Sequence, residues 1–153
     1  MACGFRLRGD IEIPPELKET RIVGPAQFAP LALEFRRILT RAGSSVLSST
    51  ATTSSIIMIE GEQFKKRVLS VDAQGRVAEY ELKYSYSFKI ITSENLELVP
   101  MQKIEFTRDY RFDPDNVLAK ETEEAQIRSE MIQFSVKQAM RRINAILKSK
   151  SET

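Results

Sequence analysis

The side chains that could carry chemistry in this chain are carboxylates, amines and one thiol. Its 153 residues include 21 Asp and Glu, 23 Lys and Arg, a single Cys and no His. Without histidine, neither Ser-His-Asp nor Cys-His catalysis can be built, and the common zinc-ligand sets are missing. A single cysteine cannot form a disulfide within the chain. We therefore predict a protein that is not an enzyme, with no catalytic residue, no cofactor and no metal.

One spacing of carboxylates is that of a calcium-binding loop. Asp113, Asp115 and Glu124 stand at the first, third and twelfth positions of such a loop. Val117 occupies a ligand position, however, and Leu118 replaces the required glycine, so the spacing does not predict a calcium site. We place Glu124 instead in the first turn of a helix, where acidic side chains complement the exposed N–H groups.

The basic side chains are also explained by local structure. Alternation in the run Lys65-Lys66-Arg67 places Lys66 on one face of a strand and its two neighbours on the other, which is typical of a solvated strand. The formal net charge of +2 is too small for a dedicated nucleic-acid binder. We therefore expect no nucleic acid among the partners.

The cysteine is Cys3, between Ala2 and Gly4. A cysteine at this place has little structural use and would be a reactive exposed thiol. It looks like the modified cysteine of a bacterial lipoprotein whose leader has been cut away, and Gly4 in place of Asp implies the outer membrane by lipoprotein sorting rules. Several acyl chains on one residue anchor a protein where a single chain is marginal. We predict Cys3 as a lipidation site.

Hydrophobic periodicity predicts the elements that position these groups. Residues 21–23 form a short strand candidate, ended by Gly24-Pro25. Pro30 opens a helix over 30–42, whose apolar residues recur at helical spacing. The Ser- and Thr-rich stretch 44–55 is interpreted as a loop with a short strand at Val46-Leu47.

The middle of the chain is predicted to be an antiparallel hairpin followed by a third strand. Two strands, separated by a bulge or bend at Glu60-Gly61-Glu62, lead to a turn at 72–75. The return strand alternates strictly, so we expect one buried face, made of Tyr80, Leu82, Tyr84, Tyr86, Phe88 and Ile90. Residues 104–112 alternate in the same way.

A long final helix is predicted from about residue 118 to 148, because this stretch has no Gly or Pro and carries an apolar stripe. The order β-α-β-β-β-α predicts an α+β two-layer sandwich, with two helices packed on one face of a four-stranded, mostly antiparallel sheet. Residues 3–148 would form a single domain, and 149–153 a flexible tail.

Four segments together resemble the LptE (RlpB) family of lipopolysaccharide-assembly lipoproteins. No single motif is specific, but the order and spacing of the four are, and the match runs from residue 3 to about 147. The segments are Cys3-Gly4-Phe5-Arg6-Leu7-Arg8-Gly9, then Gly75-x-x-Ala78-Glu79-Tyr80, then Arg108-x-Tyr110 with Pro114 and Leu118-Ala119-Lys120-Glu121, and finally Met131 with Gln138-x-x-Arg141-Arg142-Ile143.

The resemblance implies a non-enzymatic plug in the lumen of the large outer-membrane β-barrel LptD. The pair would deliver lipopolysaccharide to the outer leaflet in Gram-negative bacteria, with this chain lipid-anchored through Cys3 on the periplasmic side. Binding of lipopolysaccharide is also implied, through charge-assisted hydrogen bonds to its phosphates. Lys120 matches the Leu-Ala-Lys position of the family, and Arg76 is the cation nearest the hairpin turn. Arg108 either pairs with a carboxylate or faces the partner, and we favour the structural role.

Two alternatives stay open on the sequence alone. The first is a stand-alone periplasmic lipoprotein that binds an anionic lipid without a barrel partner. The second is an RNA-binding sheet that uses Tyr80, Tyr84, Tyr86 and Lys83 as a stacking surface. The second requires those rings to be exposed, whereas the alternation places them on the apolar face.

Overall fold

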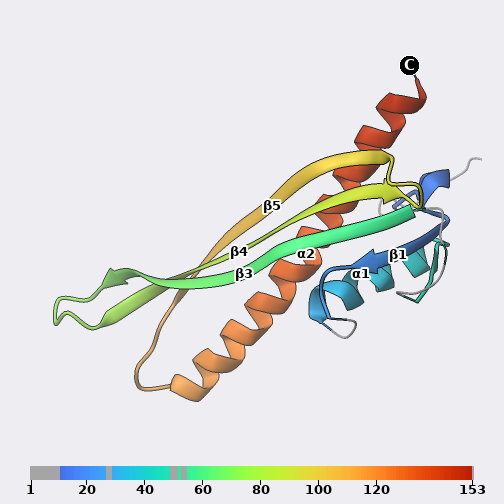
Figure 1. Cartoon of the computed structure of the whole chain (residues 1–153). Helices are drawn as coiled ribbons and strands as arrows, with labels where there is room; N and C mark the ends of the chain where they lie inside the picture. The colour runs from blue at the N-terminus through green and yellow to red at the C-terminus, as the bar shows by residue number, and fades with distance from the viewer. Residues whose placement is uncertain (1–10, 27–28, 49–51, 53–54, 153) are drawn as a thin grey trace, which may run out of the picture.

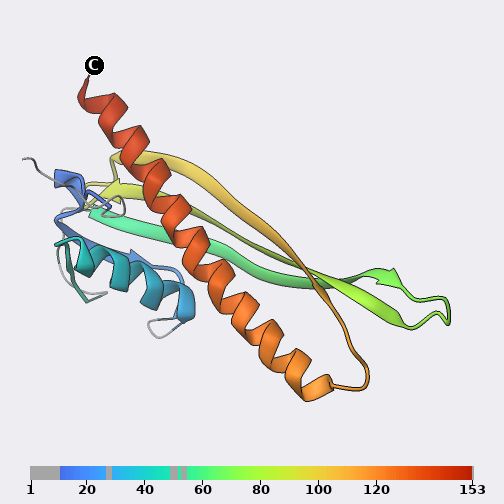
Figure 2. The same cartoon turned by 180° about the vertical axis from the view of Figure 1, so that it is seen from behind.

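A computed structural model of the chain describes residues 11–26, 29–48, 52 and 55–152. This part forms two layers, with both helices on one face of a sheet (Figures 1 and 2). The elements follow the order η1 (Pro15–Leu17), β1 (Glu19–Val23), α1 (Pro30–Arg41), β2 (Ser45–Val46), β3 (Ser55–Val71), β4 (Val77–Thr92), β5 (Glu97–Arg111) and α2 (Val117–Ser151).

The sheet has five strands in the order β2-β1-β3-β4-β5. The helices and the α+β class agree with the prediction, but the four-stranded, mostly antiparallel sheet is wrong in its strand count and element order. β1 runs parallel to both β2 and β3, while β3–β4 and β4–β5 are antiparallel, so the sheet is mixed. The added strand β2 pairs Val46 with Thr20. Two residues carry too little alternation to show from sequence that they join a sheet.

The alternating strand β4 confirms the predicted buried face. Its inward side chains are almost fully buried from Leu82 to Ile90, while Tyr80 is only half-buried. Tyr84 and Tyr86 are 0% and 1% exposed. These two rings therefore cannot stack on bases, which removes the RNA-binding alternative in the form that the sequence suggested.

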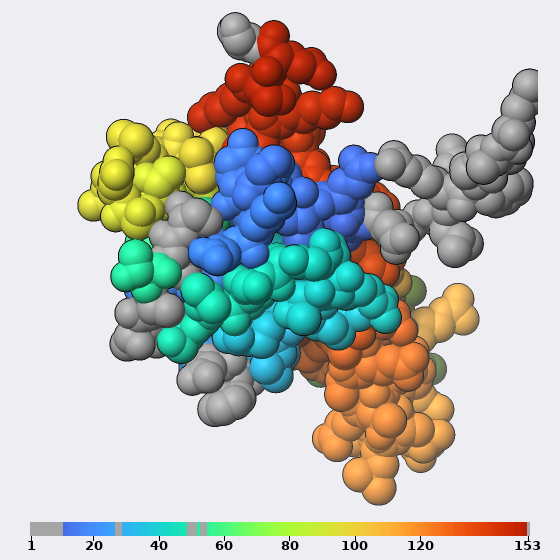
Figure 3. Space-filling model, turned by 90° about the vertical axis from the view of Figure 1, so that its right-hand side faces the viewer, coloured from blue at the N-terminus to red at the C-terminus, as the bar shows by residue number. Residues whose placement is uncertain are grey.

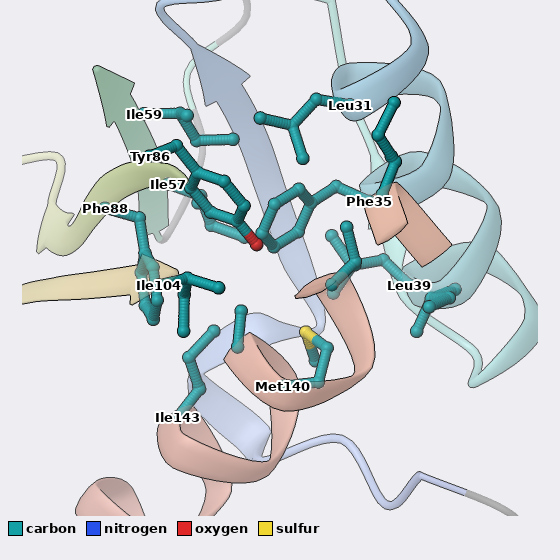
Figure 4. Close-up of a cluster of buried hydrophobic side chains, with 14 of the residues drawn as sticks. Leu31, Phe35, Leu39, Ile57, Ile59, Tyr86, Phe88, Ile104, Met140 and Ile143 are labelled. Atoms are coloured by element: carbon teal, nitrogen blue, oxygen red, sulfur yellow. The ribbon is translucent and has the colours of Figure 1, made fainter. Parts of the chain in front are cut away.

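The core lies between this face and the two helices (Figure 4). From α1, Phe35 points its ring toward Tyr86, with centroids 6.2 Å apart and planes at 77°. From α2, Met140 and Ile143 reach the same cluster. Edge-to-face aromatic pairs add about 0.5–1.5 kcal/mol beyond the area they bury. The pair therefore helps to hold α1 against the sheet.

Special backbone conformations shape the long hairpin. Gly61 has φ of +67° at the register shift between Glu60 and Gln63, which confirms the predicted bulge. At the hairpin turn, Gly75 has φ of +75°, and its N–H donates to the carbonyl oxygen of Asp72 at 3.0 Å. A glycine adopts this left-handed conformation without the strain that a side chain would add.

Helix α2 extends beyond its predicted ends. It begins at Val117 and continues to Ser151, so the first three residues of the predicted tail, 149–151, belong to the last turn of this helix. The Lys150 Nζ donates a hydrogen bond to the carbonyl oxygen of Leu98 at 2.9 Å, on the outer strand β5. This contact between distant segments stabilises the last turn of the helix and satisfies a carbonyl at the sheet edge.

Candidate functional site

Beyond the core, the molecule divides into two arms that diverge from the sheet (Figures 1 and 2). The hairpin arm is the far part of the β3–β4 hairpin, residues 64–80. The helix arm is the beginning of α2, residues 117–128. The predicted ligand residues Arg76 and Lys120 lie on these two arms, so the geometry of the arms decides what the two cations can reach.

Four residues join the arms at their base, and we call them the Glu124 cluster. The Oε2 of Glu124, on α2, accepts hydrogen bonds from Lys66 Nζ on β3 and from the Tyr110 hydroxyl on β5, each at 2.6 Å. The other carboxylate oxygen, Oε1, accepts a hydrogen bond from Arg128 Nε at 3.0 Å and lies 2.9 Å from Arg128 Nη2. One carboxylate thus ties the helix arm to two strands.

Aromatic rings surround the two cations of the cluster. Lys66 Nζ lies 4.2 Å from the centroid of the Tyr80 ring, and the Arg128 guanidinium lies 4.7 Å from that of Phe64. Such cation–π contacts contribute about 0.5–1 kcal/mol when exposed and more when desolvated. The rings therefore hold both cations beside the carboxylate even though each cation is about a third exposed.

The cluster strongly favours the ionised form of Glu124. Partial burial would raise the pKa of this carboxyl, but the hydrogen bonds from Lys66, Tyr110 and Arg128 outweigh burial and lower the pKa from 4.5 to about 2. Its side chain is only 16% exposed. The carboxylate therefore stays charged throughout the physiological range.

We expect Glu124→Gln to destabilise the protein by about 2–3 kcal/mol at neutral pH, because the lowered pKa measures what the charged form contributes. The folded-state pKa lies below the unfolded value, so this stability is present above pH 4.5 and is lost as the pH falls toward about 2. Urea unfolding measured across this pH range should show that the natural protein loses stability as the pH falls, and that the variant loses much less.

The matched control is Glu123→Gln on the same helix. Glu123 is 45% exposed and, within the described part of the chain, pairs only with Lys120, so its loss should change stability by less than about 1 kcal/mol. Equal effects of the two substitutions would show that the Glu124 cluster does not join the arms.

The structure places the predicted site residues on separate arms and does not bring them together. Lys120 lies in the first turn of α2, where its Nζ pairs with Glu123 Oε2 at 2.7 Å and its side chain is 21% exposed. Arg76 follows the hairpin turn, 63% exposed, with its Nε 2.9 Å from Asp72 Oδ2. The third predicted residue, Cys3, lies outside the described residues.

Sequence reasoning missed the role of Glu124. The expected position in the first turn is wrong, because α2 begins at Val117 and that turn contains no acidic residue. A signal was present in the strand. Lys66 shares a face with Tyr80 and Leu82, and a cation on an apolar face usually requires a carboxylate partner.

Within the described part of the chain, Arg108, on β5, does not have the carboxylate pairing that the favoured structural role would give it. It is exposed and makes no ion pair with a carboxylate among the described residues, so pairing does not explain it. Its Cα lies opposite Leu82, which in turn lies opposite Lys66, so both cations occupy one cross-strand row beside Leu82. Lys66 and Arg128 are paired with Glu124, so Arg108 is the member of this row that has no carboxylate partner among the described residues.

These features define the class of protein as a two-layer α+β domain with charged arms. Across the described residues, no three His, Cys, Asp or Glu side chains are grouped so that they could hold a metal ion. Neither of the described helices combines the length and the apolar character needed to cross a membrane.

The chain belongs to the LptE family of lipopolysaccharide-assembly proteins, and the family's sequence model matches residues 20–143. The LPS-assembly lipoprotein LptE of Photorhabdus laumondii is 26% identical over 141 residues, which covers 92% of this chain and 76% of that protein. For the same protein of Yersinia enterocolitica the identity is 25%, with 92% and 68% covered.

Solved structures share the fold. The solution structure of lipoprotein B from Nitrosomonas europaea has a TM-score of 0.77 at 31% identity, covering 98% of this chain and 96% of that one. The crystal structure of rare lipoprotein B from Shewanella oneidensis has a TM-score of 0.68 at 26% identity, covering 87% and 96%. Membership of the family makes the chain a lipoprotein of lipopolysaccharide assembly in the cell envelope.

Proposed function

We propose that this protein is a lipid-anchored, non-enzymatic subunit of the outer-membrane lipopolysaccharide translocon. It would sit in the lumen of an LptD-like β-barrel, bind lipopolysaccharide during delivery to the outer leaflet, and be anchored through Cys3 on the periplasmic side. The observation that carries the proposal is the family match over residues 20–143.

The outer face of the sheet supports a position inside another protein. Lys83, Ser85, Ser87 and Lys89 alternate with the buried residues of β4, and Lys83 pairs with Glu105 at 2.9 Å. A wide barrel encloses an aqueous lumen. A domain whose second sheet face is polar suits such a lumen, because it does not have to bury that face against lipid.

Three partly or fully exposed cations, Arg108, Lys120 and Arg76, support binding of an anionic lipid. Arg108 has no carboxylate partner among the described residues, and Lys120 and Arg76 are each partly exposed on their arms. Guanidinium and ammonium groups form strong, charge-assisted hydrogen bonds with phosphate. We assign phosphate contacts to Lys120 and Arg76 as the sequence suggests, and add Arg108.

A tagged protein purified from outer membranes tests the barrel and the ligand together. We expect a large β-barrel protein, identified by mass spectrometry, to co-purify with both the natural protein and a Lys120→Asp/Arg108→Asp variant. The bound lipopolysaccharide should fall about tenfold or more in the variant, since each lost charge-assisted bond contributes about 1.5 kcal/mol or more. Lys103→Asp, which changes a cation on the outer sheet face, is the control and should retain the lipid.

The outcomes separate the two functions that the sequence left open. If lipopolysaccharide co-purifies but no barrel protein does, the function is that of a stand-alone lipoprotein that binds an anionic lipid, and not that of a barrel plug. Unchanged lipid in the double variant would remove Lys120 and Arg108 from the binding site.

A further inference from the structure

The long edge strand of the sheet, β5, is covered along only half of its length. The strand order β2-β1-β3-β4-β5 gives β5 a single neighbour, β4, and the opposite edge strand β2 has only two residues. An edge strand presents unpaired N–H and C=O groups that can pair with another chain, and proteins normally cover or blunt such an edge. The uncovered part of β5 therefore indicates where a further strand can bind.

Side chains and a proline close the first half of β5, residues 97–103. From the second half of α2, Lys150 Nζ donates to the carbonyl oxygen of Leu98 at 2.9 Å, and Arg142 Nη1 donates to that of Lys103 at 2.6 Å. Figure 3 shows the red end of this helix beside the yellow turn that leads into β5. Pro100 lies between the two contacts and has no N–H to offer.

The second half, residues 105–109, is open, and its register decides which backbone groups point outward. The Phe112 N–H donates to the carbonyl oxygen of Ala78 at 2.9 Å, so the even-numbered residues of this part of β5 exchange hydrogen bonds with β4. Bonded and non-bonded positions alternate in an antiparallel pair. Within the described part of the chain, no hydrogen bond reaches the backbone groups that point away from β4, which are those of Glu105, Thr107 and Asp109.

The side chains beside the open half define the strand that fits it. On the helix side, Phe106 is half-buried and meets the 54% exposed ring of Phe134, with centroids 6.2 Å apart. On the other sheet face, Asp109 is exposed and forms no ion pair among the described residues, whereas Glu105 pairs with two lysines. Directly opposed pairs of apolar rings or of opposite charges stabilise a sheet. The matching segment therefore carries an apolar residue opposite Phe106 and a basic residue opposite Asp109.

A second copy of this chain does not match that description. A symmetric pairing of two β5 strands centred on Thr107 would place Glu105 of each copy opposite Asp109 of the other, and like charges directly opposite are destabilising. Moving the centre one residue forward would set two Arg108 side chains against each other. Moving it one residue back would extend the pairing to the carbonyl that Arg142 already occupies. The occupant is therefore a strand of another protein.

We propose that the open half of β5, residues 105–109, adds an extended strand of a partner protein to the sheet. Taking the β-barrel as this partner rests on the proposed function. Every strand of a closed barrel wall already has two neighbours, so the added strand comes from a loop of the barrel. Backbone hydrogen bonds supply the affinity in this mode of recognition, and the side-chain pairs at Phe106 and Asp109 supply the specificity.

Amide hydrogen exchange, followed by mass spectrometry, tests the added strand. The tagged full chain is measured alone and together with its co-purified barrel. New hydrogen bonds should slow the amides of Glu105, Thr107 and Asp109 at least tenfold in the complex. Thr107→Pro removes one outward N–H, which an edge strand tolerates, and should abolish the slowing at the two neighbouring positions. Thr107→Val keeps the N–H and is the matched control, so it should exchange as the natural protein does.

A second variant, Asp109→Lys, changes only an exposed side chain and does not require the fold to accept a proline. It should reduce the slowing at Thr107 by about fivefold or more, because it replaces an attractive cross-strand pair with a repulsive one. If the barrel slows these amides equally in the natural protein and in both variants, or does not slow them at all, this inference alone is wrong. If no barrel co-purifies with the natural protein, the proposed function fails and the barrel strand fails with it.

Discussion

Gly24→Ala should destabilise the protein by about 4 kcal/mol or more, which is a large part of the stability of a typical domain. A Cβ at this position would lie 1.8 Å from the carbonyl oxygen of Ile59 and 2.9 Å from its carbon. Gly24 also has φ of +121°, a conformation that strains any other residue by about 1–3 kcal/mol. Relief would require β1 to move away from β3, to which only four residue pairs join it.

Thermal unfolding is a direct measure of this effect. At about 2–4 °C per kcal/mol for a chain of this size, we expect Tm to fall by roughly 8–16 °C. Gly43→Ala is the control, because Gly43 also has positive φ but no atom lies within 4 Å of its added Cβ. It should cost only about 1–2 kcal/mol of backbone strain. If the two variants lose the same stability, the close approach to Ile59 does not exist in solution.

Phe35→Ala should destabilise the protein by about 3–5 kcal/mol, the usual range for removing a fully buried ring. Phe35 is 0% exposed and is the α1 residue whose ring meets Tyr86 on the sheet. Urea unfolding measures the lost free energy of unfolding. If this free energy depends on urea concentration with the same slope in both proteins, unfolding exposes the same amount of surface in both.

The control for Phe35 is Leu33→Ala on the same helix. Leu33 is 44% exposed, so its truncation should change stability by less than about 1 kcal/mol. Comparable losses in the two variants would mean that α1 does not pack on the sheet through Phe35.

The prediction of the fold succeeded where the pattern is local and long. In β4, polar and apolar residues alternate along the whole strand, and an antiparallel strand with one wet face has this pattern whatever its neighbours are. At β2 the prediction of a short strand at Val46-Leu47 was within one residue of the structure, but its place in the sheet was missed, because that place beside β1 depends on where α1 returns the chain.

The candidate site was predicted less well for a related reason. Lys120 and Arg76 were placed on the correct elements, but their partners Glu123 and Asp72 were not identified. For Glu124 the error came from the helix boundary. A residue near the start of a helix can face solvent or a strand. Which of the two Glu124 faces depends on the residue at which α2 begins and on how α2 packs.

The sequence by itself determined the two helices, the long strands, the buried face of β4 and the resemblance to the LptE family, because each depends on the order and spacing of nearby residues. Only the tertiary structure decided the mixed sheet, the two diverging arms and the pairing of Lys66 with Glu124, which are 58 residues apart. Such a pair forms when packing brings two desolvated charges within hydrogen-bond distance, and no short-range pattern in the chain encodes that distance.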